Sequence, residues 1–231
     1  MEVIVALDAP TLAQNEAVVA DLDGLATWYK VGMRLFYGSG SSALTAVRGV
    51  GARLFLDLKL HDIPHTVATA VESLAWAEPD MLTVHASGGS AMIEAARASV
   101  DRLGLRTRIV AVTVLTSLSN AELAQIGWTG DAATNAVRLA RMASEAGAHG
   151  VVCSAHEAAA MRAVVGADGW VVTPGIRLPG DAAGDQSRVA LPSDAAAWGA
   201  SHAVIGRPIL AAADRRSKWR ELEENLKGAQ V

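Results

Sequence analysis

The sequence predicts an α/β fold, a single (β/α)8 barrel formed by all 231 residues. Eight short apolar segments alternate with segments of helical periodicity, which is the pattern of a parallel sheet whose strands are joined by helices. These segments are apolar throughout, as expected for strands covered on both faces. An open, doubly wound sheet has the same alternation, but eight units favour a closed barrel. No linker or change of composition divides the chain, so we expect one domain, residues 1–231.

The predicted strands are apolar runs that end at a glycine, a proline or a polar residue. They cover residues 3–7, 27–31, 53–58, 81–85, 108–114, 150–153, 170–173 and 202–205. Helices are expected where apolar residues recur every three or four positions. They cover residues 12–22, 41–50, 63–76, 88–100, 132–146, 155–164 and 213–226, with a short helix near Asn120. Pro64 falls in the first turn of its helix, where proline is tolerated.

Composition and charge exclude several classes of protein. Hydrophobic residues make up 51% of the chain and charged residues 19%, which is typical of a compact globular protein. The net charge of -4 provides no basic surface, so nucleic acid is not an expected partner. The single cysteine, Cys153, cannot form an intrachain disulfide and is expected to be a buried apolar side chain. We see no signal peptide and no membrane-spanning run, and therefore expect a cytoplasmic protein.

Three charged residues crowd the stretch from Leu54 to Thr66, which reads LFLDLKLHDIPHT. Side chains two positions apart on a strand point to the same face, so Asp57 and Lys59 should project together at the end of the third strand. Asp62 follows in the next turn. Charges this close are costly unless they neutralise one another or carry out chemistry. Because charges at strand ends of a barrel are typical of catalytic residues, we interpret the group as catalytic.

Polar side chains also lie at the ends of most other predicted strands. In a barrel these ends meet at one mouth, where the active site lies. Each residue also has a structural alternative: Asp8 could cap the following helix, and Lys30 could be a solvated strand end. For His85 we prefer that alternative and expect a neutral, hydrogen-bonded core histidine. The residues at strand ends are Asp8, Lys30, Asp57, Lys59, His85, Thr116, Ser117, Arg177 and Arg207.

A phosphate site is expected after the seventh and eighth strands, its usual place in this barrel. Residues 173–188 have no convincing apolar period, and a loop of this length is usually functional. Within it, Arg177 and Gln186 supply donors suited to an anion. Gly206 allows a close backbone approach, and Arg207 offers a forked guanidinium. A surface salt bridge is the alternative for Arg207.

The same residues argue against a metal site. Asp57 and Asp62 flank Lys59, so an ammonium group already occupies the place that a cation would take. No other set of His, Asp and Glu residues has convincing metal-ligand spacing. No serine lies in a G-x-S-x-G turn, which removes support for a Ser-His-Asp triad.

The motif Asp57-x-Lys59-x-x-Asp62, followed by Ile63 and Thr66, resembles the signature of the orotidine 5'-phosphate decarboxylase family. The first part, D-x-K-x-x-D, also occurs in related sugar-phosphate barrels. The resemblance becomes specific when it is joined to the Pro-Gly-Ile-Arg motif, the downstream glutamine and the Gly-Arg-Pro-Ile motif, and it covers nearly the whole chain. Further matching segments are residues 7–8, 30–32, 83–86, 114–117, 174–177, 184–186 and 205–209.

The resemblance implies a decarboxylation of orotidine 5'-monophosphate to UMP and CO2 without cofactor or metal, the last step of de novo UMP synthesis. It implies that Lys59 donates a proton to C6 of the pyrimidine and that Asp57 lies beside the substrate carboxylate. Lys30 would complete the array of charges. Asp62 would join it from the other subunit of a homodimer with shared active sites.

The resemblance also implies contacts for the rest of the substrate. Asp8 would hold the ribose hydroxyls, and Thr116, with Ser117 close by, would contact the base. Ile63 and Thr66 would contribute to substrate binding within the signature. The residues expected to bind the phosphate are Arg177, Gln186, Gly206 and Arg207.

Two other functions remain open from the sequence. One is a magnesium-dependent decarboxylase or aldolase of the same barrel superfamily that acts on a keto-sugar phosphate, although no extra acidic ligands accompany Asp57. The other is a non-catalytic barrel that senses UMP, which would have no need of Lys59 as a proton donor.

Overall fold

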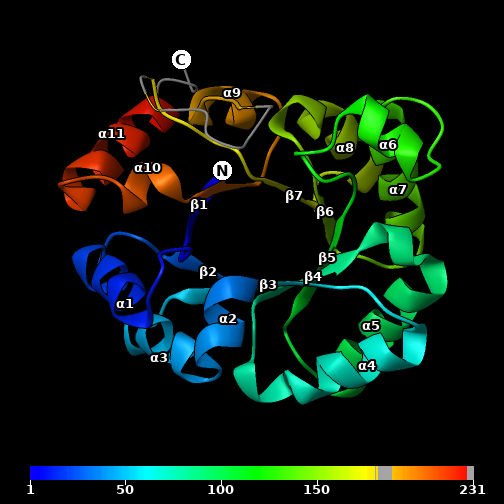
Figure 1. Ribbon diagram of the computed structural model, residues 1–231, viewed down its shortest axis with the longest axis horizontal. Helices are drawn as coiled ribbons and strands as arrows, with labels where there is room; N and C mark the ends of the chain where they lie inside the picture. Colours follow the sequence, from blue (N-terminus) through cyan, green and yellow to red (C-terminus); the bar gives the residue numbers. More distant parts are fainter. Residues whose placement is uncertain (180, 182–188, 228–231) are drawn as a thin grey trace.

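The computed structural model describes residues 1–179, 181 and 189–227. Eight parallel strands pair in sequence order and form a closed barrel (Figure 1). The barrel closes where β8 pairs with β1, with Val5 opposite Ile205. The predicted (β/α)8 barrel is therefore confirmed, and the open doubly wound sheet is wrong.

All eight predicted strands are present, and each observed boundary lies within two residues of the predicted one. Their apolar side chains can be buried on both faces because the barrel interior lies on one side and the ring of helices on the other. The strands are β1 (Glu2–Ala6), β2 (Trp28–Gly32), β3 (Arg53–Leu60), β4 (Met81–His85), β5 (Arg108–Val112), β6 (Gly150–Val152), β7 (Trp170–Thr173) and β8 (His202–Ile205).

Helices surround the barrel, and local residues determine several of their ends. Thr11 and Gln14 form a capping box at the start of α1, and Pro64 occupies the first turn of α4 as predicted. The predicted continuation of α4 to residue 76 is instead a separate 3-10 turn, Ala75–Ala77. The helices are α1 (Leu12–Asp21), α2 (Met33–Ser39), α3 (Ser42–Gly49), α4 (Pro64–Ser73), α5 (Ser90–Arg102), α6 (Asn120–Gln125), α7 (Ala132–Glu145), α8 (Ala158–Val165), α9 (Pro192–Ala197), α10 (Arg207–Leu210) and α11 (Arg215–Lys227).

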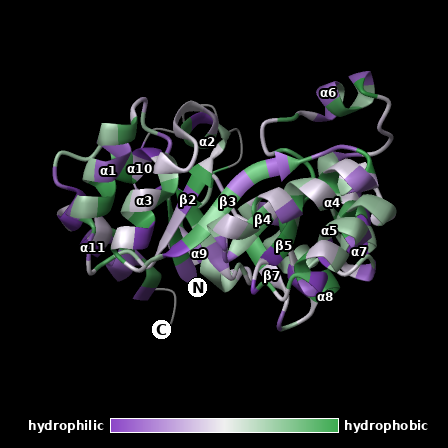
Figure 2. Cartoon of the chain, turned by 90° about the horizontal axis from the view of Figure 1, so that it is seen from below, coloured by the Kyte–Doolittle hydropathy of each residue, from purple (hydrophilic) through white to green (hydrophobic). Residues whose placement is uncertain are grey.

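The core has two parts, one between the sheet and the helices and one inside the barrel. Figure 2 shows mostly hydrophobic strands between helices that carry both hydrophobic and hydrophilic residues. Large side chains such as Trp28, Phe55 and Met81 fill the barrel interior, so it is a packed core and not a pore. Cys153 is buried, as predicted. None of the helices that the structure describes has the length and apolar character needed to cross a membrane.

Candidate active site

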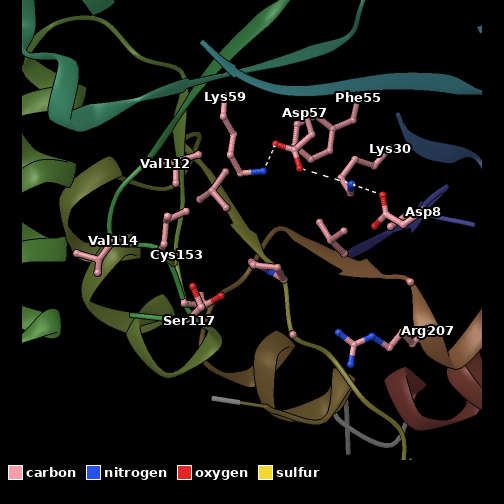
Figure 3. Close-up of a pocket in the computed structure, with 18 of the residues that line it drawn as sticks. Asp8, Lys30, Phe55, Asp57, Lys59, Val112, Val114, Ser117, Cys153 and Arg207 are labelled. Carbon is pink, nitrogen blue, oxygen red and sulfur yellow. Dashed lines mark hydrogen bonds and ion pairs between the residues drawn. The ribbon is translucent and has the colours of Figure 1, made fainter. Parts of the chain in front are cut away.

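A row of alternating charges crosses the barrel mouth from β1 to β3 (Figure 3). Lys30 Nζ lies 3.1 Å from Asp8 Oδ1 and 3.5 Å from Asp57 Oδ2. Lys59 Nζ lies 2.8 Å from Asp57 Oδ1. The structure therefore brings together four of the predicted residues, Asp8, Lys30, Asp57 and Lys59, as two carboxylates and two ammonium groups. The alternative role of Asp8 as a helix cap is wrong, because Thr11 caps α1.

The pairing of β1, β2 and β3 positions this row. Ala6 lies opposite Lys30, and Gly32 lies opposite Asp57, so each charged side chain leaves its strand at a similar height. Gly32 provides the space for the row. A Cβ at this position would lie 2.9 Å from Lys30 Nζ and 3.3 Å from Asp8 Oδ1, closer than ordinary contacts.

Asp57 is the buried centre of the row, with 9% of its surface exposed. Thr83 Oγ1 donates a hydrogen bond to Asp57 Oδ1 at 3.0 Å. Burial alone would raise the pKa of Asp57, but the charges of Lys30 and Lys59 and the hydrogen bonds from Lys59 and Thr83 outweigh it and lower that pKa. Asp57 is therefore ionised at neutral pH, with a cation on each side.

An irregularity in β3 directs Lys59 into the mouth. Leu56 pairs with Leu82 and Leu60 pairs with Val84, so three residues of β3 bulge opposite Thr83 alone. Lys59 has a φ of 50°, which is uncommon for a residue other than glycine. Its N–H donates to Thr83 Oγ1 at 2.9 Å, which anchors the bulge. The proximity of Asp57 and Lys59 was predicted from strand alternation, but the structure achieves it with this bulge.

Thr83 was not singled out by the sequence reasoning as a functional residue. It accepts a hydrogen bond from Lys59 N–H and donates one to Asp57, so it joins the two central residues of the row. A signal for it exists in the sequence, because Thr83 is the one polar residue inside the apolar run Met81–Val84. A buried hydroxyl in such a strand needs a partner.

Arginine residues lie across the cavity from the lysines. Arg177 follows β7, and Arg207 follows β8 at the start of α10, as the sequence predicted. Figure 3 shows Arg207 on the side of the cavity away from Lys59. Burial and the charge of Arg207 lower the pKa of Arg177, while Asp181 acts in the opposite direction. Two guanidinium groups this close favour an anion between or beside them.

A cavity of about 410 Å³ joins the two ends of the site. Its apolar wall comes from inward-facing strand residues, among them Phe55, Val112 and Val204. The sequence reasoning did not assign these residues, since apolar strand residues look the same whether they face the cavity or the packed core. The predicted residues that line the cavity are Asp8, Lys30, Asp57, Lys59, Thr116, Ser117, Arg177, Gly206 and Arg207.

Other predicted site residues lie elsewhere. Asp62, Ile63 and Thr66 are exposed at the start of α4 and do not line the cavity. The Asp62 carboxylate accepts the N–H of Ile63 at 2.7 Å, and no ion pair within the described part of the chain includes it. Gln186 lies outside the described residues.

His85 is only partly buried, so the expected core position is wrong. Its ring packs against the ring of His61, with the centroids 5.1 Å apart. Burial, together with the charges of His61 and Lys59, lowers the pKa of His85, which agrees with the expected neutral form. Among the described residues, no group of three or more His, Cys, Asp or Glu side chains could hold a metal ion.

Fold and site together define a class of protein, the (β/α)8 barrels with charged residues at the carboxyl ends of the strands and arginines after β7 and β8 that line the same cavity. Comparison with known proteins identifies the family. The chain belongs to the orotidine 5'-phosphate decarboxylase / HUMPS family, whose model matches residues 1–222.

Relatives and solved structures support this assignment. The chain is 46% identical to an orotidine 5'-phosphate decarboxylase of Chromohalobacter salexigens over 96% of this chain and 94% of that protein. It is 49% identical to one from Laribacter hongkongensis over 92% of this chain and 87% of that protein. The crystal structure of orotidine 5'-phosphate decarboxylase from Lactobacillus acidophilus has a TM-score of 0.85 and 36% identity, covering 97% of this chain and 98% of that chain.

Proposed function

We propose that this protein decarboxylates orotidine 5'-monophosphate to UMP and CO2, without a metal or cofactor, as the last step of de novo pyrimidine nucleotide synthesis. The observation that carries the proposal is Asp57, a buried carboxylate bracketed by Lys30 and Lys59 across a cavity from Arg177 and Arg207. The arginines suit the phosphate of a nucleotide, and the lysines suit the negative charge that decarboxylation leaves on the pyrimidine ring.

The row of charges interacts differently with the substrate and with the transition state. The Asp57 carboxylate repels the substrate carboxylate, and this repulsion disappears as the C6–carboxylate bond breaks and CO2 departs. The bonding electrons remain at C6, where the Lys59 ammonium stabilises them and then donates a proton. The Lys59 amine regains its proton from solvent. Phosphate binding at the far end holds the substrate in place, so remote binding energy favours the transition state.

The rest of the cavity fits the remaining parts of the nucleotide. Asp8, held by Lys30 at 3.1 Å, has a second carboxylate oxygen for the ribose hydroxyls. Thr116 and Ser117 lie after β5, where they can contact the polar edge of the base. Apolar residues such as Val112 provide a surface for the flat face of the pyrimidine ring.

We further infer a homodimer in which each subunit completes the other's site. Asp62 and Thr66 are exposed, and Ile63 exposes 66% of its surface next to them. Tyr37, which follows β2, exposes 70%. Large apolar side chains that are this exposed are typical of an interface with another protein chain. Across such an interface, Asp62 of one subunit would meet Lys59 of the other. A cytoplasmic location fits the single buried Cys153.

The activity is tested by measuring CO2 released from orotidine 5'-monophosphate labelled in the carboxylate, with a chelator present. We expect release by the wild-type protein and a loss of about 10³-fold or more for Lys59→Ala, because the general acid and the charge at C6 are both removed. Calorimetry with UMP checks that the variant still binds nucleotide. Dependence on magnesium, or turnover of hexulose phosphates instead, would favour the keto-sugar phosphate alternative, and full activity of Lys59→Ala would contradict the role of Lys59.

Shared sites are tested by mixing two inactive variants, Lys59→Ala and Asp62→Ala. A mixed dimer with shared sites has one site in which both Lys59 and Asp62 are intact. Random exchange of subunits should therefore restore about a quarter of the wild-type activity, since half of the dimers are mixed and half of their sites are intact. If Asp62 acts within its own subunit, mixing will restore nothing.

A further inference from the structure

The last helix of the chain contacts the segment that carries Arg177. Lys218 on α11 lies 3.1 Å from the Asp181 carboxylate, and both side chains are only 18% exposed. Helix α11 also packs against α10, which begins at Arg207 (Figure 1). The ion pair thus connects α11 to the segment after β7, beside the helix that carries the second arginine.

Asp181 fixes the backbone that follows Arg177. One of its carboxylate oxygens accepts the Leu178 N–H at 2.8 Å, and its own N–H donates to the Leu178 carbonyl at 3.1 Å. The other carboxylate oxygen faces Lys218. On the other side of the segment, the Arg177 N–H donates to the Ala190 carbonyl at 3.0 Å. Arg177 is therefore held between a bridge to residue 190 and a turn closed by Asp181.

The charges around a second cavity explain why Arg177 needs the contacts made by Asp181. This cavity, of about 350 Å³, is lined by Arg177, Arg207, Asp181 and Lys218 together with three apolar residues of α10 and its end. The two arginines also line the main cavity, so they separate the two spaces. Like charges in one wall repel each other. The Asp181 carboxylate opposes that repulsion, which is consistent with its upward effect on the pKa of Arg177.

An exposed ion pair would contribute little, since solvent screens it and its side chains lose entropy. The Lys218–Asp181 pair differs because both side chains are partly buried and because Asp181 makes two further hydrogen bonds to the backbone beside Arg177. Glu221 lies 3.1 Å from the same ammonium group and holds Lys218 in place on α11.

We propose that Lys218 and Asp181 are a positioning pair that holds Arg177 beside Arg207, and that they determine affinity for the substrate phosphate without affecting the chemical step. The inference rests on the proposed function, in which the two arginines bind the phosphate of the nucleotide. Lys218 and Asp181 touch no reacting atom, so their removal should change KM and leave kcat intact.

The test compares Lys218→Met and Asp181→Asn with the wild-type protein. We expect KM for orotidine 5'-monophosphate to rise about tenfold with kcat unchanged, and competitive inhibition by inorganic phosphate to weaken by a similar factor. Binding of uridine, which has no phosphate, should not change. The double variant should have the same KM as either single variant, because each single variant already removes the ion pair between Lys218 and Asp181. Lys218→Arg, which keeps the charge, should restore most of the phosphate affinity.

Arg215→Met is the matched control. It removes another ion pair from α11, the one with Asp21 at 2.5 Å, which joins the helix to α1 and not to the segment with Arg177. Its KM should match that of the wild type. An unchanged KM in Lys218→Met and Asp181→Asn, a fall in kcat alone, or an equal loss of uridine binding would overturn the proposal. If Lys218→Met does not fold, Lys218→Gln replaces it under the same criteria.

Failure of the proposed function would be visible separately. If the wild-type protein releases no CO2 from orotidine 5'-monophosphate, the assignment of the reaction is wrong. Calorimetric titration with inorganic phosphate then still tests the pair, because it requires no turnover. Weaker phosphate binding by Lys218→Met than by Arg215→Met supports the positioning role, and equal binding overturns it.

Discussion

At the scale of single residues, the site depends on close contacts that leave little room for change. Lys30 is held between Asp8 and Asp57, at 3.1 and 3.5 Å, directly above a residue without a side chain, Gly32. The Thr83 hydroxyl holds the next two residues of the row, because it accepts the Lys59 N–H and donates a hydrogen bond to the Asp57 carboxylate. Gly32 and Thr83 thus determine where the charged groups lie.

Gly32→Ala tests this dependence. The added Cβ would lie 2.9 Å from Lys30 Nζ and 3.3 Å from Asp8 Oδ1, so the Lys30 ammonium group must shift from its position between Asp8 and Asp57. We expect kcat/KM for decarboxylation to fall about 10²-fold, since a small displacement of an oriented group has an effect of this size. The control is Gly38→Ala, which places a methyl group in open space within α2. Wild-type kinetics for Gly32→Ala would show that the space above Gly32 is not required.

At the scale of elements, the sequence predicted the strands well and the short helices poorly. The strand from Met81 to His85 was located to the residue, because a buried parallel strand is a continuous apolar run. Helices α2, α9 and α10 have seven residues or fewer, which is too short for an apolar period to be visible, and they were not predicted. The bulge in β3 was also missed, since no local pattern distinguishes it from regular strand.

The site, like the fold, has some residues that the sequence predicted and others that it did not. Its charged residues stand out from the sequence because polar side chains at the ends of apolar strands are conspicuous, and Asp57, Lys59, Arg177 and Arg207 all line the cavity. The contribution of Thr83 depends on which residues face each other across two strands in register. A single strand does not contain that information.

Arg162 of α8 stabilises the loops at the end of the barrel opposite the site. Its guanidinium donates hydrogen bonds to the carbonyls of Gly166, Ala167, Gly169 and Gly199, at distances from 2.6 to 3.1 Å. These carbonyls lie at the end of α8 and before β7 and β8, on the face away from the site. The Arg162 side chain therefore links the loop before β7 to the loop before β8.

Arg162→Met should lower the free energy of unfolding by about 3 kcal/mol, because several carbonyls lose a charged donor. The rate of decarboxylation at low temperature should not change, since residues at this end of a barrel contribute to stability and not to catalysis. Chemical denaturation measures the first quantity and CO2 release the second. The control is Arg141→Met at an exposed position of α7. Equal stability of the two variants would contradict the role of Arg162.

At the scale of the whole molecule, burial of histidine makes stability depend on pH. His202 lies at the start of β8 among aromatic rings, 4.6 Å from that of Trp170 and 5.5 Å from that of Trp28 between centroids. Burial lowers its pKa to about 4, assisted by the charges of Arg53, Arg162 and the N-terminus and opposed by Glu2. Burial also lowers the pKa of His149 to about 4.

These shifts determine the direction of the pH effect. An unfolded chain takes up a proton on histidine near pH 6.5, whereas the folded protein does so only near pH 4. Between these values the unfolded state binds more protons, so the free energy of unfolding must fall as the pH decreases from 6.5 to 4. His202→Gln removes one of the two groups and should reduce the slope over this interval. Urea denaturation at a series of pH values measures this slope, and a slope as steep as that of the wild type would show that folding does not lower the pKa of His202.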